Sequence, residues 1–207
     1  MADLKQSDFD YPARHCNGFA HWLGKTIIRL TGWQVAGAVP KTNKSMIIIA
    51  APHTSNWDLF FLLGAAYSFR LSIQWLMKAS VFVPIVGDFL KFLGGIPVDR
   101  SQRNNLVSDL AEKIRESDGI ALVVPPAGTR GYTEYWKSGF YQIALAAQIP
   151  VVCGYLDYPN KIAGLGEAFD LTGDMTADMN RIRAFYEPIT GRHPEQKSRI
   201  RLREEDS

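Results

Sequence analysis

Uninterrupted apolar runs, separated by short polar stretches, dominate the middle of the chain. Residues 46–51, MIIIAA, are apolar without alternation, and so are residues 120–124 and most of residues 149–152. Strands that are buried on both faces of a mostly parallel sheet have this pattern, whereas half-exposed strands alternate apolar and polar positions. A looser alternation over residues 71–77 predicts a further strand.

Apolar positions at helical spacing predict helices between and after these strands. Residues 59–69 are almost wholly apolar, residues 103–117 keep one apolar face, and residues 175–186 turn Met179 and Ile182 inward. Strands that alternate with helices build α/β domains. The sequence therefore predicts an α/β fold with a mostly parallel central sheet flanked by helices.

Two apolar segments have alternative interpretations that the pattern leaves open. Residues 17–32 predict an amphipathic helix with Trp22 on its apolar face and with Lys25 and Arg29 on other faces. That helix either packs on the sheet or lies on a membrane surface, because Trp and flanking basic residues are typical of interfacial helices. Residues 81–93 predict an apolar wall, which is either core or the lining of an acyl-chain channel.

Length and composition indicate one globular domain with small appendages. The 207 residues are 46% hydrophobic and 21% charged, and a chain of this length supports a sizeable core. We expect an N-terminal arm and amphipathic helix over residues 1–33, the main domain over residues 34–190, and a charged tail over residues 191–207. The mixed charges of the tail predict that it is solvated.

Charge and cysteine content argue against several kinds of partner. The formal net charge of +2 is too small to predict nucleic-acid binding. Cys16 and Cys153 lie far apart and form no C-x-x-C pair, so neither a disulfide framework nor a metal site is expected. A reducing cytoplasm is the default location for such a chain.

No segment has the pattern of a membrane-spanning helix. The longest uncharged run, residues 138–156, is interrupted by two glutamines and a proline, so it fits a helix followed by a strand. Residues 1–10 lack the apolar core of a secretory signal. Contact with lipid is therefore expected from the surface, through Trp22 and Trp33 beside basic residues.

The polar turn after residues 46–51 carries the first candidate chemistry. Pro52 ends the apolar run, and Ser55 with Asp58 three residues later has the spacing of a capping box at a helix start. His53 lies about one turn before Asp58. A carboxylate at that spacing can orient one ring nitrogen of histidine while the other acts as a general base. The spacing by itself also fits a merely capping carboxylate and an ordinary loop histidine.

Residues 94–100, GGIPVDR, offer a first group that binds anions. They predict a sharp turn, a short strand and an exposed charged end at Arg100. A guanidinium presents a rigid fork of donors to phosphate or carboxylate. Arg100 therefore either binds a phosphate or forms a salt bridge with Asp99 or Asp58.

A second anion-binding segment follows the strand predicted over residues 120–124. The loop of residues 125–131 leaves the carboxyl end of that strand, and open α/β sheets bind ligands beyond such ends. Glycine allows the backbone to approach an anion closely, while hydroxyl, guanidinium and ammonium groups donate hydrogen bonds to it. The positions that supply these groups are Gly128, Thr129, Arg130 and Lys137.

Together these motifs resemble the glycerolipid acyltransferase family, of the lysophosphatidate acyltransferase type. The resemblance covers roughly residues 47–155 and implies an O-acyltransferase of phospholipid biosynthesis, with His53 as general base and Asp58 as its orienter. It makes residues 34–190 the acyltransferase domain. The motifs that follow the family in order and spacing are His53 to Asp58, residues 94–100, residues 128–130 and residues 136–140.

The resemblance also implies the substrates. A fatty acyl group passes from acyl-CoA or acyl carrier protein, as co-substrate without any other cofactor, to the hydroxyl of lysophosphatidate or a related lysolipid. A membrane surface is an implied partner, and the implied location is peripheral, on the cytoplasmic face. The positions implied to bind substrate are Arg100, Ala127, Gly128, Thr129, Arg130 and Lys137.

Ala127 departs from the family pattern, which normally has Glu immediately before Gly-Thr-Arg. Loss of this carboxylate leaves open a catalytically impaired or silent peripheral protein of the same fold that binds lipid or CoA. A hydrolase that uses His53 and Asp58 on water is a further alternative. Beyond residue 158 the resemblance thins, and residues 164–166 are expected to form a turn.

Overall fold

The computed structural model of the chain describes residues 16–41, 44–98 and 103–206. Within these residues, seven strands form one sheet in the order β1-β7-β6-β2-β5-β3-β4, and only the β6–β7 pair is antiparallel. The predicted α/β fold with a mostly parallel sheet is confirmed. The strands are β1 (Gln34–Gly37), β2 (Met46–Ala50), β3 (Gln74–Lys78), β4 (Gly95–Val98), β5 (Ala121–Val124), β6 (Val151–Asp157) and β7 (Ile162–Phe169).

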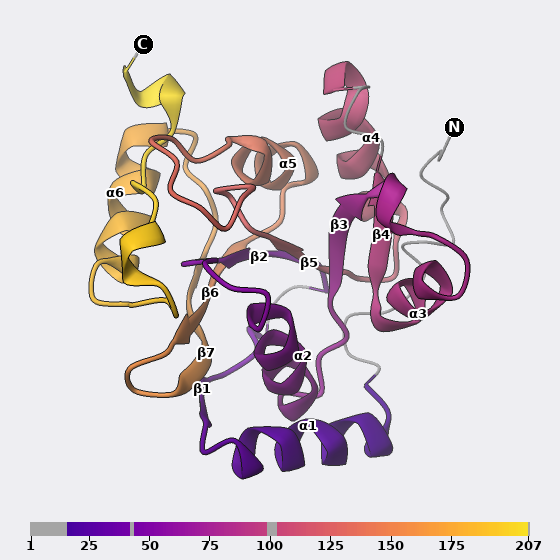
Figure 1. Cartoon of the computed structure of the whole chain (residues 1–207). Helices are drawn as coiled ribbons and strands as arrows, with labels where there is room; N and C mark the ends of the chain where they lie inside the picture. The colour runs from indigo at the N-terminus through magenta and orange to yellow at the C-terminus, as the bar shows by residue number, and fades with distance from the viewer. Residues whose placement is uncertain (1–15, 42–43, 99–102, 207) are drawn as a thin grey trace.

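Helices cover both faces of the sheet (Figure 1). On one face lie α1 (Gly18–Leu30) and α2 (Asp58–Ser68), and on the other lie α4 (Arg103–Glu116), α5 (Gly139–Ala147) and α6 (Met175–Tyr186). α3 (Val86–Leu93) connects β3 to β4 at one end of the strand order. The short 3-10 helices are η2 (Ala79–Val81), η3 (Pro194–Gln196) and η4 (Arg203–Asp206).

Strand β2 shows why the apolar run does not alternate. Ile47 and Ile49 pack in a cluster with residues of α4, α5 and α6, whereas Met46 and Ile48 pack in another cluster with Ala66 of α2. All four strand residues are at most 1% exposed. Because successive side chains of a strand point to opposite faces, a central strand covered on both sides needs an unbroken apolar run.

The strands β1 and β7 have no counterpart in the sequence prediction. The turn expected at residues 164–166 is wrong, because these residues lie within β7. Their glycines serve packing: a Cβ on Gly164 would lie 2.7 Å from the Tyr155 ring, and one on Gly166 would lie 2.1 Å from the Phe185 ring. Glycine inside a strand often marks such a close approach rather than a chain reversal.

The C-terminal segment, residues 191–206, packs against the domain. The expectation of a solvated tail is therefore wrong for this segment. Leu202 is fully buried and forms a parallel β-bridge with Trp136. Some of its charged residues form ion pairs, including Glu205 with Arg183 of α6 at 2.7 Å and Arg201 with Asp206. A mixed charge pattern in the sequence does not distinguish such internal pairing from solvation.

The amphipathic helix predicted over residues 17–32 is present as α1, which packs on α2 through a close contact at Gly24. Trp22 is 59% exposed, as a surface contact with lipid requires. Trp33 is only 6% exposed and stacks on Phe61 with ring centroids 4.3 Å apart. The predicted lipid contact through Trp33 is therefore wrong, since its ring belongs to the core.

Residues 81–93 are neither ordinary core nor a closed channel. They include the end of η2, a loop and α3, and most of their large apolar side chains face outward. The outward-facing side chains, called the α3 surface below, are 42% to 83% exposed and belong to Val81, Val83, Ile85, Val86, Phe89 and Phe92.

Among the described residues, no helix has the length and apolar character needed to cross a bilayer.

Candidate active site

Strand β2 delivers His53 to the carboxyl edge of the sheet, on the turn that precedes α2. The ring nitrogen Nδ1 of His53 lies 2.9 Å from Oδ2 of Asp58. Because an ionised carboxylate only accepts hydrogen bonds, Nδ1 carries the proton, and in the neutral ring Nε2 keeps a free lone pair. The His53 side chain is 23% exposed and that of Asp58 only 7%. The structure thus combines an accessible base with a buried orienter.

Hydrogen bonds from the surrounding chain hold the Asp58 carboxylate. Oδ2 also accepts from the backbone N–H groups of Thr54 at 2.9 Å and Ser55 at 3.0 Å, while Oδ1 accepts from the hydroxyl of Tyr158 at 2.7 Å. Burial raises the pKa of Asp58, but hydrogen bonds from His53, Tyr158 and Ser55 outweigh burial and hold that pKa below its usual value. The carboxylate therefore stays charged beside the imidazole.

The start of α2 differs from the predicted capping box. The helix begins at Asp58, its N-cap is Trp57, and no side chain caps it. Ser55 was expected at the N-cap, but its Oγ accepts from the N–H of Trp57 at 3.2 Å, ahead of the helix. Only the return contact from the Asp58 carboxylate to the Ser55 N–H resembles the predicted motif. The carboxylate is therefore placed for the histidine as well as for the turn.

The loop after β5 lies beside the turn that carries His53, because β5 pairs in parallel with β2. Within it, Gly128 has a φ of 67° and donates its N–H to the carbonyl of Pro125 at 3.0 Å. A Cβ at this position would lie 2.6 Å from Nζ of Lys137. The backbone angle favours glycine here, and the flexible end of the Lys137 side chain lies over it. The structure thus brings two of the predicted anion-binding positions together.

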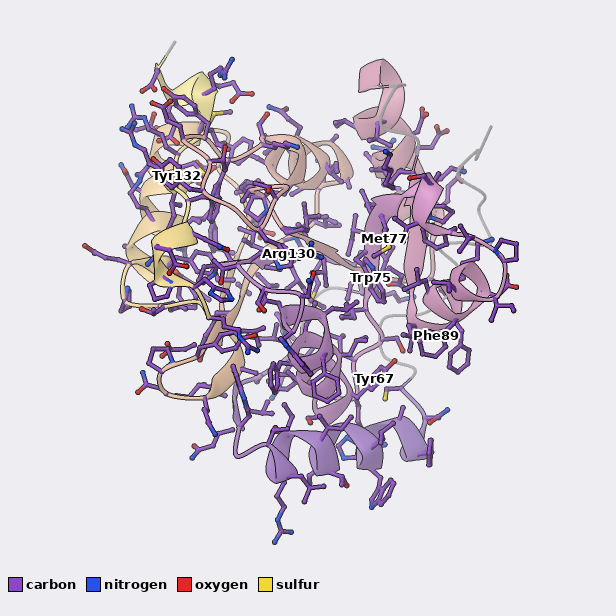
Figure 2. All side chains as sticks on the ribbon, viewed as in Figure 1. Tyr67, Trp75, Met77, Phe89, Arg130 and Tyr132 are labelled. Carbon is purple, nitrogen blue, oxygen red and sulfur yellow. The ribbon has the colours of Figure 1, made fainter. Side chains whose placement is uncertain are left out.

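The structure describes only some of the remaining positions that are predicted to bind an anion. Thr129 and Arg130 are exposed on the same loop, which Figure 2 marks at Arg130. The Thr129 hydroxyl accepts from the N–H of Gly131 at 3.3 Å. Arg100 and Asp99 lie outside the described residues, so their predicted roles have no geometry. Binding of an anion by any of these groups stays a prediction.

A small pocket joins the two loops to the C-terminal segment. Its lining includes His53 and Thr54 from the turn before α2, Ala127 from the loop after β5, and Gln196 and Ser198 from the C-terminal segment. Ala127 is 9% exposed. The position at which the chain departs from the family that its motifs resemble therefore faces the same space as the candidate base.

The contribution of the C-terminal segment was missed by sequence reasoning. Turned so that its amide nitrogen donates, Gln196 lies 3.1 Å from the carbonyl of Thr54 and 2.9 Å from that of Arg130. The N–H of His193 donates to the Thr54 hydroxyl at 3.2 Å. Lys197 donates to three main-chain carbonyls at and after the end of α6. The only sequence signal for this packing is the few apolar residues among the charges.

Comparison with known proteins identifies the family of the chain. The family model described as Acyltransferase matches residues 33–156, which is more than half of the chain. The chain belongs to the acyltransferase family. This match confirms the resemblance drawn from the motifs, and it includes His53, Asp58 and the loop after β5. It ends before Tyr158 and the C-terminal segment.

Two curated relatives show how far the similarity extends. The 1-acyl-sn-glycerol-3-phosphate acyltransferase of Saccharomyces cerevisiae is 30% identical over 116 residues, which cover 53% of this chain and 38% of that protein. An uncharacterized acyltransferase of Schizosaccharomyces pombe is 27% identical over 143 residues, which cover 62% of this chain and 50% of that protein. The chain therefore spans half or less of the length of these relatives.

A solved structure supports the fold. The crystal structure of the 1-acyl-sn-glycerophosphate (LPA) acyltransferase PlsC from Thermotoga maritima superposes with a TM-score of 0.56 at 21% identity. The similarity covers 83% of this chain and 75% of that chain. The mostly parallel sheet flanked by helices is thus shared with that solved structure.

Proposed function

We propose that this acyltransferase moves a fatty acyl group from an acyl thioester, carried by CoA or acyl carrier protein, to the hydroxyl of a lysophospholipid-like acceptor such as lysophosphatidate. The observation that carries the proposal is the 2.9 Å contact between His53 Nδ1 and Asp58 Oδ2 beside a pocket at the carboxyl edge of the sheet. Family membership supplies the reaction class, and the relatives named above motivate the choice of acceptor.

In the proposed reaction, His53 acts as the general base. Its Nε2 takes the proton of the acceptor hydroxyl while that oxygen attacks the carbonyl carbon of the thioester. The carbon–sulfur bond then breaks, the acyl group stays on the acceptor oxygen, and the departing thiolate takes the proton from the imidazolium. The charged Asp58 fixes the ring and stabilises the imidazolium between these two proton transfers.

Basic groups near the pocket hold the anionic end of the acceptor in this proposal. Lys137 lies over Gly128, and Arg130 is exposed on the same loop. Arg100 is assigned the same role by its motif alone. Charged donors of this kind bind phosphate strongly, and holding the acceptor at its phosphate places its hydroxyl near His53.

Thioester consumption, measured with and without a lysolipid acceptor, tests the proposed function. Transfer requires the acceptor, whereas hydrolysis by His53 and Asp58 does not, and a silent lipid- or CoA-binding protein consumes no thioester under either condition. The silent alternative is favoured by one observation, that Ala127 faces the pocket where the family has Glu. Binding of acyl-CoA without turnover would support that alternative.

We also propose that a membrane surface supplies the acceptor, with the protein peripheral on the cytoplasmic face. The α3 surface begins just after β3, which runs parallel to β5 as β2 does, so the loop that carries Val83 and Ile85 leaves the same edge of the sheet as His53. Figure 2 shows Phe89 on α3 at the periphery of the molecule. Large exposed apolar groups of this kind are typical of lipid or partner contacts.

Co-sedimentation with anionic vesicles tests this location. We expect the protein to pellet at low ionic strength and to be released by salt or mild detergent. The double change Phe89→Ser and Phe92→Ser should reduce pelleting more than the matched double change Phe19→Ser and Trp22→Ser on α1. Equal pelleting of the first variant and the unmodified protein would place the contact elsewhere. Indifference of the unmodified protein to vesicles would favour a soluble acceptor.

A further inference from the structure

The hydroxyl of Tyr158 reaches the catalytic pair from outside the part of the chain that the family model matches. It donates to Oδ1 of Asp58 at 2.7 Å, whereas His53 and two backbone amides use Oδ2. We propose that Tyr158 is a positioning residue for acyl transfer, whose hydroxyl fixes the plane of the Asp58 carboxylate and shares its negative charge. This inference rests on the proposed function.

The Tyr158 side chain is held in place by the fold. Its ring meets the ring of Trp33 edge to face, with centroids 4.9 Å apart, and that of Phe61 in the same way at 5.9 Å. Its backbone N–H donates to the carbonyl of Thr190 at 3.0 Å. A group that orients a catalytic residue must itself be locked by packing. The aromatic contacts provide that restraint without using the hydroxyl.

The charges around Tyr158 keep it in the protonated, donating form. Burial raises its pKa, and the hydrogen bond to Asp58 raises it further, while the positive charge of Arg192 lowers it without reversing the shift. Arg192 belongs to the C-terminal segment and lies 5.8 Å from the ring centroid of Trp57. Among the described residues, the charged groups that act on Tyr158 are therefore Asp58 and Arg192, and His53 is the titratable partner on the other oxygen of Asp58.

Sharing the charge of Asp58 has a kinetic consequence. With the hydroxyl present, only part of the carboxylate charge stabilises a proton on His53. Without it, the full charge faces the ring and holds the imidazolium more strongly, so the base stays occupied by a proton up to higher pH. Loss of the hydroxyl also frees the carboxylate to rotate, which misaligns the ring. The stronger hold on the proton lowers the rate on the acidic side of the pH profile, and the misalignment lowers it at every pH.

The Tyr158→Phe variant tests the proposal because it removes the hydroxyl and keeps the ring. We expect kcat to fall about tenfold to a hundredfold, the loss that is typical when a residue that orients a functional side chain is removed. The KM for the acceptor should change little. The acidic limb of the pH profile of kcat/KM should move to higher pH. A structural role alone would leave that limb in place.

Tyr141→Phe is a matched control for this change. The Tyr141 hydroxyl also donates to a buried carboxylate, that of Asp178 at 2.8 Å, but neither residue lines the catalytic pocket. We expect this variant to lose thermal stability while keeping the kcat and the pH profile of the unmodified protein. If Tyr158→Phe behaves in the same way as this control, the positioning role is wrong.

Replacement of Tyr158 by 3-fluorotyrosine supplies a change of the opposite sign. The fluorine makes the hydroxyl a stronger donor, so the acidic limb should move to lower pH, and movement in the same direction as Tyr158→Phe would contradict the proposal. The NMR titration of the His53 ring nitrogens in both variants follows the same shifts without turnover. If the unmodified protein transfers no acyl group, the proposed function fails. If the titration of the His53 ring is the same in both variants as in the unmodified protein, the role of Tyr158 is wrong, whether or not the protein transfers acyl groups.

Discussion

The candidate active site has two halves that differ in origin and in proposed role. One half comes from the family-matched residues 33–156 and supplies the proposed reacting pair, His53 and Asp58, which lie five residues apart in one turn. The other half comes from Tyr158 and residues 191–202, which supply contacts to the first half. Reacting groups can thus be encoded locally, whereas the contacts that restrain them come from distant parts of the chain.

The largest effect is expected from the first half. His53→Ala should lower acyl transfer by about 10² to 10⁴, the contribution of a positioned general base. It should leave the fold intact because, among the described residues, the ring forms a hydrogen bond only with Asp58. Steady-state kinetics with acyl-CoA and a lysolipid measure the rate, and melting temperature checks the fold. Full activity in this variant would remove the basis of the proposed mechanism.

Asp58→Asn should have the next largest effect, about 10²-fold on kcat, the lower end of the contribution of a positioned base, because an amide can hold the wrong tautomer of His53. It should also change the dependence of stability on pH. The pKa of Asp58 is lowered in the folded state, so its carboxylate stabilises the fold above the unfolded pKa of about 3.9, and this contribution is lost as pH falls through the folded pKa.

Denaturant unfolding between about pH 3 and pH 7 measures that contribution. The unmodified protein should lose more free energy of unfolding towards acidic pH than the Asp58→Asn variant does. Parallel pH dependences for the two proteins would show that the carboxylate has no lowered pKa. Such a result would weaken the role of Asp58 as a permanently charged orienter.

A smaller effect is expected from the second half. Gln196→Ala removes the contacts to the carbonyls of Thr54 and Arg130, so the two loops of the first half lose a common restraint. We expect roughly a threefold to tenfold rise in the KM for the acceptor with a modest fall in kcat, on the scale of one hydrogen bond. Glu195→Ala is the control, since that side chain is 68% exposed and pairs only with His193 among the described residues.

The halves also differ in how far the sequence could predict them. Strands β2 and β5 and helix α6 follow from apolar runs and helical spacing, because each meets the core with a regular pattern. The contact between the His53 and Asp58 side chains follows from their spacing within one turn. Neither Tyr158 nor Gln196 has such a signal, since each contacts the turn that carries His53 across a hundred residues or more. Only tertiary packing brings these contacts together.

Two wrong predictions have the same cause. The glycines of β7 fit a turn locally, but they are explained by the rings of Tyr155 and Phe185 that pack on them. Trp33 fits an interfacial aromatic locally, but the fold stacks it on Phe61. Local patterns report what a residue allows, whereas its neighbours in space decide which of the allowed roles it takes.

The smallest expected effect concerns Ala127, the residue of the first half that faces the second. Ala127→Glu should raise turnover several-fold, because the family carboxylate would enter the pocket near Lys137, which lies over the adjacent Gly128. An ammonium paired with a carboxylate is aimed more firmly at an anionic acceptor than a solitary one. Burial opposes the change, since Ala127 is 9% exposed and a carboxylate there loses hydration.

Ala127→Gln separates the effect of the charge from the effect of the side-chain shape, because glutamine has nearly the same shape as glutamate without its charge. If pairing with Lys137 matters, only the Glu variant should gain turnover across a panel of lysolipids, and the gain should shrink at high salt as the charges are screened. Melting temperature reports any cost of burial. A fast Ala127 form that is slowed by the glutamate would show that alanine suits a different acceptor, and the lysophosphatidate-like assignment would then fail while the His53–Asp58 mechanism could stand.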